Sequence, residues 1–536
     1  MKKPALLRTL FLAPLLLCAI SAVVVCSTGG YDLSLGPMHL GSHSPFKAIL
    51  QMEGAFLFAL IGLGLLSPAE SALPSASSHR LGFYAWLALL ITLVGAAYAP
   101  SLAVNFQYQD WDFRLASSAI RSLHDTVELF TKPQADGFYR PMTFLALLVD
   151  DRVFGNHAWG YHLQNIAFHI ANCILFLILA RTLGFAESVA RWAAVLFAVA
   201  AVNFEPVLWP AARFDLTATA CTLLAIIFAL RYLDGASAST PAFSAIAFAL
   251  GILNKESAYC LPLVLGCLIL FWRKWPVSRV LRLAAVTFLV IAVMILIRLA
   301  VLRGVGGYPD SPHYAFTLKT LISLFTRLPV GLFGVNSSVT PPFWLIASIA
   351  TLGGVMIAAV IAGARASRPD LVLLLCALLT ALPTLNIINW IGEPMQQARY
   401  LYMPGIWLCL FVASVMSTRK SAIPLLALWA AANLAGLEHN LNVYRTTLAK
   451  TEVIAERVRR DASPGVRTIL IRDLPDQPNG VFFASSELIT QIKSAIPDAV
   501  IFRDNNEACP DLAYRWNPST TDLVREPMPA FCPSPP

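Results

Sequence analysis

Long apolar stretches alternate with short polar breaks along most of this 536-residue chain. Many of these stretches are close to the ~20 residues that an α-helix needs to cross the ~30 Å hydrocarbon core of a bilayer. The pattern therefore predicts a polytopic α-helical membrane protein with about 13 transmembrane helices. The predicted spans are residues 8–27, 47–66, 81–100, 161–180, 188–204, 213–232, 241–254, 257–273, 283–302, 343–363, 370–389, 400–416 and 421–437.

The composition supports this class. Hydrophobic residues make up 57% of the chain and charged residues only 13%, and the mean hydropathy is +0.66, which excludes an ordinary soluble domain. The first span follows Met1-Lys2-Lys3, as in a signal peptide. Because no small-residue cleavage site stands out and a second span follows, we expect an anchor. The pI near 9.0 is explained by loops that face anionic lipid, so nucleic-acid binding is not needed to account for it.

Basic residues in the short loops predict the orientation, because cytoplasmic loops carry an excess of Lys and Arg. With the N-terminus inside, the inner loops hold Lys2, Lys3, Arg8, Arg80, Arg181, Arg231, Arg273, Lys274, Arg279, Arg282, Arg365, Arg368, Arg419 and Lys420. This alternation of loops between the two sides of the membrane requires segment 317–335 to lie along the outer surface as an amphipathic segment instead of crossing. We therefore expect a multi-pass protein of the cell inner (plasma) membrane, with residues 101–160 and the C-terminus extracytoplasmic.

Three regions are predicted along the chain. They are an N-terminal transmembrane hairpin (1–80), a transmembrane region (81–437) with a large outer loop (101–160), and a small extracytoplasmic α/β appendage (438–536). Within the appendage, the patterns predict helices at 438–461 and 487–495 and strands at 466–471, 480–484 and 499–502. Cys509 and Cys532 also lie in the appendage, where an oxidising compartment would permit a disulfide.

The large outer loop begins with two acids set among aromatic residues. Asp110 and Asp112 lie within Gln107-Tyr108-Gln109-Asp110-Trp111-Asp112-Phe113-Arg114, directly after an apolar run. Charged groups beside a membrane helix are costly unless chemistry or a charged ligand requires them, so this stretch is a candidate active site. The alternative is a solvated loop whose Trp and Tyr lie at the level of the lipid headgroups.

Polar residues within the fourth predicted span form a stripe. His162, Asn165, His169 and Asn172 are spaced three or four residues apart, which places them on one face of a helix. Such a stripe must face protein or a wet cavity. Hydrogen bonding between helices is the structural alternative. A histidine metal site is disfavoured because the two histidines are two turns apart.

Further charged residues fall in the breaks assigned to the outer side. Glu205, Arg213 and Asp215 occur within one short break, and they could form a salt-bridge cluster or bind a phosphate through the guanidinium. Lys255 and Glu256 lie between two short apolar segments. They could form an ion pair at the membrane interface, or Lys255 could bind a phosphate. Arg399 and Tyr400 give a further cation beside an aromatic ring, and Arg140 gives another within the large loop.

The order of these motifs resembles that of a known superfamily. The motifs are Asp110-Trp111-Asp112, Tyr139-Arg140-Pro141-Met142-Thr143, Gly160-Tyr161-His162-Leu163-Gln164-Asn165 with His169, Glu205 to Trp209 with Arg213 and Asp215, Asn254-Lys255-Glu256-Ser257-Ala258, and Arg399-Tyr400-Leu401-Tyr402-Met403-Pro404. Over roughly residues 81–440 the chain resembles the GT-C superfamily of polyprenyl-phosphate-sugar glycosyltransferases. The resemblance is strongest to the protein O-mannosyltransferase-like branch that includes the transmembrane-and-TPR mannosyltransferases.

The chain also departs from that pattern. Trp111 separates two acids that are usually adjacent, Asn203 replaces a common histidine, and Ala398 replaces an expected acid. The TPR array is absent, and the hairpin within 8–66 is additional. These departures leave the catalytic acid, the sugar and the acceptor open.

The resemblance implies transfer of a sugar from a polyprenyl-phosphate donor to an extracytoplasmic acceptor, either a protein hydroxyl or a cell-envelope glycan. It implies an inverting hexosyltransferase in which Asp110 or Asp112 acts as the base or holds a divalent cation, Mg²⁺ or Mn²⁺. The implied substrate-binding residues are Arg140, His162, Asn165, Glu205, Arg213, Asp215, Lys255, Glu256, Arg399 and Tyr400.

Two other functions compete with this one. A non-enzymatic transporter or flippase of a lipid-linked sugar would also need cations facing a membrane cavity, but it would be expected to show paired, interrupted spans in two halves. An O-antigen polymerase or ligase would typically place its large outer loop late in the chain.

Overall fold

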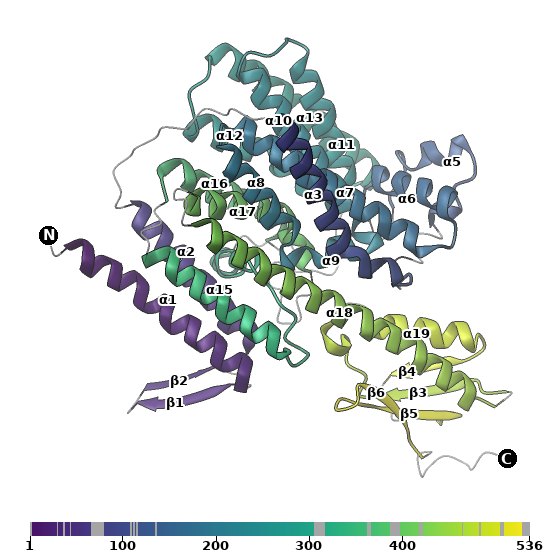
Figure 1. Ribbon diagram of the computed structural model, residues 1–536. Coiled ribbons are helices and arrows are strands. Elements are labelled where there is room, and N and C mark those ends of the chain that lie inside the picture. Colours follow the sequence, from purple (N-terminus) through teal and green to yellow (C-terminus); the bar gives the residue numbers. More distant parts are fainter. Residues whose placement is uncertain are drawn as a thin grey trace.

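The computed structural model is a helical bundle joined to a small α/β unit (Figure 1). It describes residues 3–28, 30–35, 38–42, 44–65, 80–107, 110, 113, 116–134, 137–304, 317–361, 366–385, 397–417, 422–463, 465–481, 484–503 and 509–527. The α-helices are α1 (Lys3–Thr28), α2 (Pro45–Leu65), α3 (Arg80–Tyr98), α5 (Leu123–Glu128), α6 (Pro141–Phe154), α7 (Ala158–Thr182), α8 (Glu187–Ala198), α9 (Phe204–Leu208), α10 (Arg213–Leu233), α11 (Thr240–Asn254), α12 (Leu261–Phe271), α13 (Val277–Leu302), α14 (Leu318–Arg327), α15 (Phe343–Ile361), α16 (Arg368–Ala381), α17 (Tyr402–Met416), α18 (Ile423–Asp461) and α19 (Ala484–Ala495).

Each of the predicted spans coincides with a helix, and the chain is a multi-pass membrane protein. Among the described residues, six helices are long and apolar enough to cross a membrane, or up to seven if the bent pair Glu187–Ala198 and Ala201–Leu208 forms one span. Several others, such as α11 and α12, are apolar but shorter. The count of about 13 crossings therefore stays a prediction.

The loops assigned to the inner side meet at one end of the bundle. Arg273, which follows α12, donates to the Thr182 carbonyl at 3.1 Å and to the Asp234 carboxylate at 2.6 Å. The neighbouring Trp272 indole donates to the Leu183 carbonyl at 3.1 Å. Three connections far apart in sequence are thereby held together. The polar breaks that carry the candidate site gather at the other ends of the same helices.

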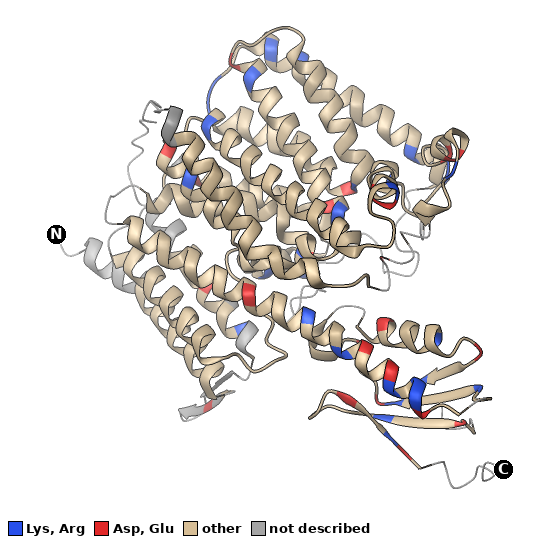
Figure 2. Cartoon of the chain, turned by 45° about the vertical axis from the view of Figure 1, so that its right-hand side comes forward, with Lys and Arg blue, Asp and Glu red and all other residues tan. Residues whose placement is uncertain are grey.

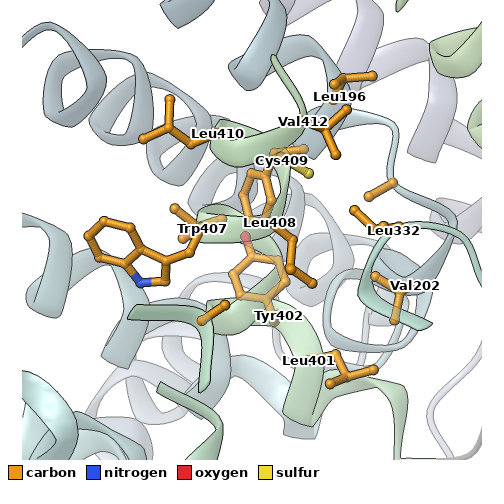
Figure 3. Close-up of a cluster of buried hydrophobic side chains, with 14 of the residues drawn as sticks. Leu196, Val202, Leu332, Leu401, Tyr402, Trp407, Leu408, Cys409, Leu410 and Val412 are labelled. Atoms are coloured by element: carbon orange, nitrogen blue, oxygen red, sulfur yellow. The ribbon is translucent and has the colours of Figure 1, made fainter. Parts of the chain in front are cut away.

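Helix α17 lies in the centre of the bundle and is buried on nearly every side. Figure 3 shows Tyr402, Trp407, Leu408 and Val412 of this helix among side chains from other elements, including Leu196 of α8. A helix that is apolar all round is stable only when it is enclosed. The packing fixes the start of α17, and with it the preceding residues 398–401.

Two helices present apolar residues outward in different ways. α13 exposes Phe288, Leu289 and Leu296, and few of its residues are buried, as expected for a helix that faces lipid. α14 is amphipathic, exposes Ile322 and Phe325, and is too short and polar to qualify as a span. This agrees with the predicted amphipathic segment at 317–335.

The N-terminal hairpin packs into the same bundle. α1 and α2 contact α15, where Gly353 permits a close approach because an added Cβ would lie 3.1 Å from the Ala19 Cβ and 3.2 Å from the Met52 sulfur. Phe56 of α2 packs against Trp429 of α18 at 5.4 Å. Between α1 and α2, β1 (Tyr31–Leu35) and β2 (Met38–Ser42) form an antiparallel hairpin that the sequence patterns did not predict.

The C-terminal unit contains a four-stranded sheet in the order β4-β3-β5-β6. Its strands are β3 (Thr468–Arg472), β4 (Val500–Arg503), β5 (Leu512–Asn517) and β6 (Asp522–Arg525). β3 is parallel to β4 and β5, while β6 is antiparallel to β5. A separate hydrophobic cluster, which includes Val458, Ile469, Leu488 and Trp516, joins the sheet to α18 and α19.

Several predictions for this unit need correction. The helix expected at 438–461 is the continuation of α18, which runs unbroken for 39 residues from the bundle into the C-terminal unit. The strand expected at 480–484 is wrong, because Pro478 and Asn479 form a tight turn, with φ 51° at Asn479, and α19 begins at Ala484. β5 and β6 were not predicted. Cys509 is disulfide-bonded, and its expected partner Cys532 lies outside the described residues.

Candidate functional site

Asp110 lies at the start of the large loop and is buried, with 3% of its surface exposed. Its two carboxylate oxygens accept hydrogen bonds from backbone N–H groups, from Gln107 at 2.9 Å and from Ala211 at 2.8 Å. The Gln107 side chain is held in turn by the Tyr444 hydroxyl of α18 at 3.1 Å. Burial raises the pKa of Asp110 to about 7, although both backbone hydrogen bonds act to lower it.

Ala211 belongs to a short segment, residues 209–215, that links Asp110 to the other charged groups. This segment includes a 3₁₀ turn (Pro210–Ala212) and the first residues of α10. The Trp209 ring lies under the Arg399 guanidinium at 4.7 Å. The Phe214 ring lies under Arg140 at 4.7 Å and under Lys255 at 4.8 Å. Residues 209–215 therefore touch every predicted cation of the site.

Arg213 itself is completely buried and fully engaged within the protein. Its guanidinium forms an ion pair with Asp150 of α6, donates to the Asn165 side chain at 2.9 Å, and donates to the Tyr161 carbonyl at 2.8 Å. To bind a phosphate, Arg213 would first have to give up these bonds. Removing one partner of a buried ion pair is strongly destabilising, so this arrangement fits a residue that positions α6, α7 and α10.

Lys255, Asp215, Arg399 and Glu205 form a second buried cluster. The Lys255 ammonium pairs with Asp215, whose other oxygen lies 4.0 Å from the Arg399 Nε. Arg399 binds Glu205 twice, through its Nη1 at 2.7 Å and its backbone N–H at 2.8 Å. The Tyr400 ring lies 4.5 Å from the Lys255 Nζ. Burial lowers the pKa of Lys255 to about 8, and the neighbouring arginines lower it as well, while Asp215 opposes the shift.

A third group of charges is more open to solvent. Arg140 donates to one Glu256 oxygen at 2.7 Å, and Arg298 of α13 donates to the other at 3.1 Å. Side-chain exposure is 15% for Arg140 and 11% for Arg298, compared with 5% for Lys255 and 3% for Arg399. The two guanidinium groups share the Glu256 carboxylate at the edge of the site.

The predicted polar stripe on α7 is confirmed as a buried face. His162 contacts the Val104 carbonyl at 2.9 Å, and Asn165 donates to the Trp209 carbonyl at 2.9 Å. Deeper in the bundle, His169 and Asn172 both contact the Tyr402 hydroxyl, at 2.7 and 3.1 Å. These bonds hold the start of the 101–160 loop, residues 209–215 and α17 against one helix.

The structure thus brings together Asp110, Arg140, His162, Asn165, Glu205, Arg213, Asp215, Lys255, Glu256, Arg399 and Tyr400 at one end of the bundle. Asp112 lies outside the described residues. Sequence reasoning missed Asp150, Arg298 and Tyr444. Arg298 is a charged residue within an apolar helix and Asp150 directly follows the apolar run 144–149, so that signal could have identified these two, whereas Tyr444 lies in a polar stretch.

The predicted divalent cation can be tested against the side chains present. Among the described residues, no three His, Cys, Asp or Glu side chains gather closely enough to hold a metal ion. The described residues do not form a site for Mg²⁺ or Mn²⁺, and no chemical step is assigned to a metal.

The fold and the site define a multi-pass helical membrane protein with a buried acid and several cations at one end of its bundle. No family model matches the chain. The chain is 28% identical over 185 residues to the protein O-mannosyl-transferase Tmtc2 of Drosophila melanogaster. The match covers 31% of this chain and 20% of the fly protein, so the chain spans about a fifth of the length of that relative. Over the matched residues, the chain is therefore similar to a protein O-mannosyl-transferase, as the sequence motifs predicted.

Solved structures with a partly similar arrangement include ArnT from Cupriavidus metallidurans bound to undecaprenyl phosphate, at 16% identity and a TM-score of 0.43, covering 81% of this chain and 94% of that one. The apo oligosaccharyltransferase of Archaeoglobus fulgidus has 12% identity and a TM-score of 0.44, and the match covers 80% of this chain and 65% of that one. The mycobacterial arabinofuranosyltransferase AftD has 14% identity and a TM-score of 0.38, and the match covers 77% of this chain and 30% of that one.

Proposed function

We propose that this protein is a membrane glycosyltransferase that moves a sugar from a polyprenyl-phosphate donor to a hydroxyl of an extracytoplasmic acceptor. The observation that carries the proposal is that one segment, residues 209–215, contacts both the buried Asp110 carboxylate and the cations of Lys255, Arg140 and Arg399. The match to a protein O-mannosyl-transferase supports the same reaction class. We place the protein in the inner (plasma) membrane, with this site on the extracytoplasmic side.

Asp110 is the proposed base. The acceptor oxygen forms a bond to the anomeric carbon while its proton passes to the Asp110 carboxylate. The bond from the anomeric carbon to the phosphate oxygen breaks, and its electron pair leaves with polyprenyl phosphate. A pKa of about 7 suits a base that works near neutral pH. We propose a hexose as the sugar and a single, inverting displacement, with Asp112 as the alternative base.

The cations are proposed to hold the phosphate. Arg140 and Arg298 are the more exposed pair, so the lipid phosphate meets them first. Lys255 and Arg399 are buried beside aromatic rings, where their charges are poorly screened and stabilise the negative charge that develops on the leaving oxygen. Asp215, Glu205 and Glu256 keep these cations in place before the donor binds.

The lipid chain of the donor is proposed to lie along α13. This helix exposes Phe288, Leu289 and Leu296, and it carries Arg298 near its C-terminal end. A polyprenyl chain along this helix would bring its phosphate to the level of Arg298, whose side chain lies on the side of α13 opposite Leu289 and Leu296 and pairs with Glu256, the partner of Arg140. The donor would then enter from the bilayer without leaving lipid.

Transfer by purified protein tests the proposal. A panel of labelled polyprenyl-phosphate hexoses is incubated with hydroxyl-bearing peptides and glycans, and the transferred label is measured. Arg298→Met should raise the KM for the donor by ~10-fold or more, since a charge-assisted hydrogen bond contributes ~1.5–3 kcal/mol. Arg282→Met is the matched control, because Arg282 is an exposed residue of the same helix at its other end. If the wild-type protein transfers no sugar from any donor to any acceptor, the proposal is wrong.

A further inference from the structure

A groove of about 570 Å³ lies between the bundle and the C-terminal unit. One wall comes from Asn105 and Phe106 before Asp110, together with the α6–α7 junction. The other wall comes from α18 and α19. Its lining residues include Asn105, Asn156, Glu452, Thr490, Gln491 and Ser494. The volume falls within the ~300–1,000 Å³ typical of small-molecule sites.

The groove is lined by residues that closely precede Asp110 in the chain. Asn105 and Phe106 are separated from Asp110 by only a few residues, and the Gln107 N–H binds the Asp110 carboxylate. The Asn105 side chain donates to Glu452 of α18 at 2.6 Å, which ties the two walls together. Glu487 of α19 also lines the groove, and its charge acts on the Asp110 carboxylate. Asp110 itself does not line the groove; Gln107, which follows the lining residue Phe106, stands between the groove and the buried carboxylate.

The lining has a distinctive chemistry. Side-chain amides and hydroxyls dominate it, with two carboxylates, while Phe106 and Ala158 supply apolar surface. Amides and hydroxyls both donate and accept, and carboxylates accept, which matches the mixed donors and acceptors of a sugar ring. Arg445 adds one cation at a smaller adjoining pocket of about 60 Å³. The balance of charge is negative, so a polyanion would be repelled.

Resting on the function proposed above, we infer that this groove binds the acceptor, and that the acceptor is a saccharide chain without acidic groups. The groove directs one hydroxyl of the saccharide to Asp110, while Asn105, Gln491 and Glu487 hydrogen-bond the neighbouring sugar units. The long helix α18 makes this possible because it fixes the C-terminal unit to the bundle without a flexible joint.

A peptide acceptor fits this groove less well. Extended peptides are usually held by an exposed sheet edge, an apolar groove or an aromatic-lined groove. Here the walls are two helices and a loop, and the four-stranded sheet contributes no residue to the lining.

Direct binding tests the inference independently of catalysis. Maltotriose, the glucosamine trimer, trigalacturonic acid and a Ser/Thr-containing peptide are titrated calorimetrically into the full-length protein in detergent. We expect the two non-acidic saccharides to bind, and the acidic one to bind about tenfold more weakly or worse, a difference of ~1.4 kcal/mol. Peptide binding without saccharide binding would overturn the inference, as would no binding by any of the four.

Variants on α19 locate the site. Thr490→Trp and Ser494→Trp fill the groove and should weaken saccharide binding about tenfold or more, whereas Lys493→Trp should not, because this exposed neighbour does not line the groove. In transfer assays, the same two variants should raise the KM for the acceptor and leave the KM for the donor unchanged. Equal behaviour of all three variants overturns the groove assignment. Failure of the wild type to transfer any sugar instead counts against the proposed function.

Discussion

Replacing Asp110 by asparagine removes the proposed base while keeping its shape. The carboxylate accepts two backbone N–H groups, at 2.9 and 2.8 Å, but an amide offers only one oxygen. One buried N–H then loses its acceptor, which costs ~1–3 kcal/mol of folding stability. Transfer should fall by ~10²-fold or more, the usual contribution of a general base.

The pH dependence of the transfer rate and of folding stability gives a second test of Asp110 as the base. Because the base must be ionised, the wild-type rate should fall about tenfold per pH unit below the pKa of about 7 and level off above it. Burial raises this pKa above its usual 3.8, so Asp110 favours the folded state fully below pH 4 and loses that contribution as pH rises to 7. The difference amounts to ~4 kcal/mol. Asp110→Asn lacks this titration, so its stability deficit should shrink as pH rises from 4 to 7.

Initial transfer rates and thermal unfolding in detergent are measured across pH 4 to 9 for the wild type and Asp110→Asn. Asp125→Asn is the matched control, since Asp125 is an acid of the same outer loop that caps α5 at the protein surface. The control should keep the wild-type rate and inflection. A fully active Asp110→Asn, or an unchanged inflection in that variant, would refute the role of Asp110 and leave Asp112 as the candidate base.

Three further predictions concern other parts of the molecule. Lys255→Met should raise the KM for the donor by an amount equivalent to ~1.5–3 kcal/mol, and an unchanged KM in steady-state assays would exclude Lys255 from phosphate binding. Arg213→Met should destabilise the fold by ~3–5 kcal/mol because Asp150 is left unpaired. Adding Asp150→Leu should restore most of that loss in thermal unfolding, and no restoration would argue against the ion pair. Reporter fusions at Asp136 and Pro536 should show extracytoplasmic activity only; cytoplasmic activity at either point would make the orientation wrong.

The positions of the helices could be read from the sequence because apolar length and helical periodicity are local properties. The stripe from His162 to Asn172 was predictable for the same reason, since spacing alone puts its residues on one face. The C-terminal strands were harder. β5 and β6 have no long alternating pattern, and β5 is specified by pairing with β3, some forty residues earlier. Short strands of this kind depend on tertiary contacts that periodicity does not reveal.

The sequence could not show which charges are neutralised inside the protein. Arg213 and Lys255 both follow apolar stretches, yet Arg213 is enclosed by Asp150, Asn165 and Tyr161, whereas Lys255 shares the Asp215 carboxylate with Arg399. Asp150 is 63 positions from its partner. Figure 2 shows how few charged residues the bundle contains compared with the C-terminal unit. Each buried ion pair in the bundle therefore has a large effect on the charge of the site.

The most direct test of the account is the fate of the donor lipid. Purified protein in detergent, where no membrane sides exist, is given a labelled polyprenyl-phosphate sugar together with acceptor saccharides and peptides, and free polyprenyl phosphate is measured. We expect release of polyprenyl phosphate with matching sugar transfer, and loss of both in Asp110→Asn. If the lipid stays intact in detergent while proteoliposomes containing the protein move it across the bilayer, the protein is a transporter of a lipid-linked sugar and the glycosyltransferase account is contradicted.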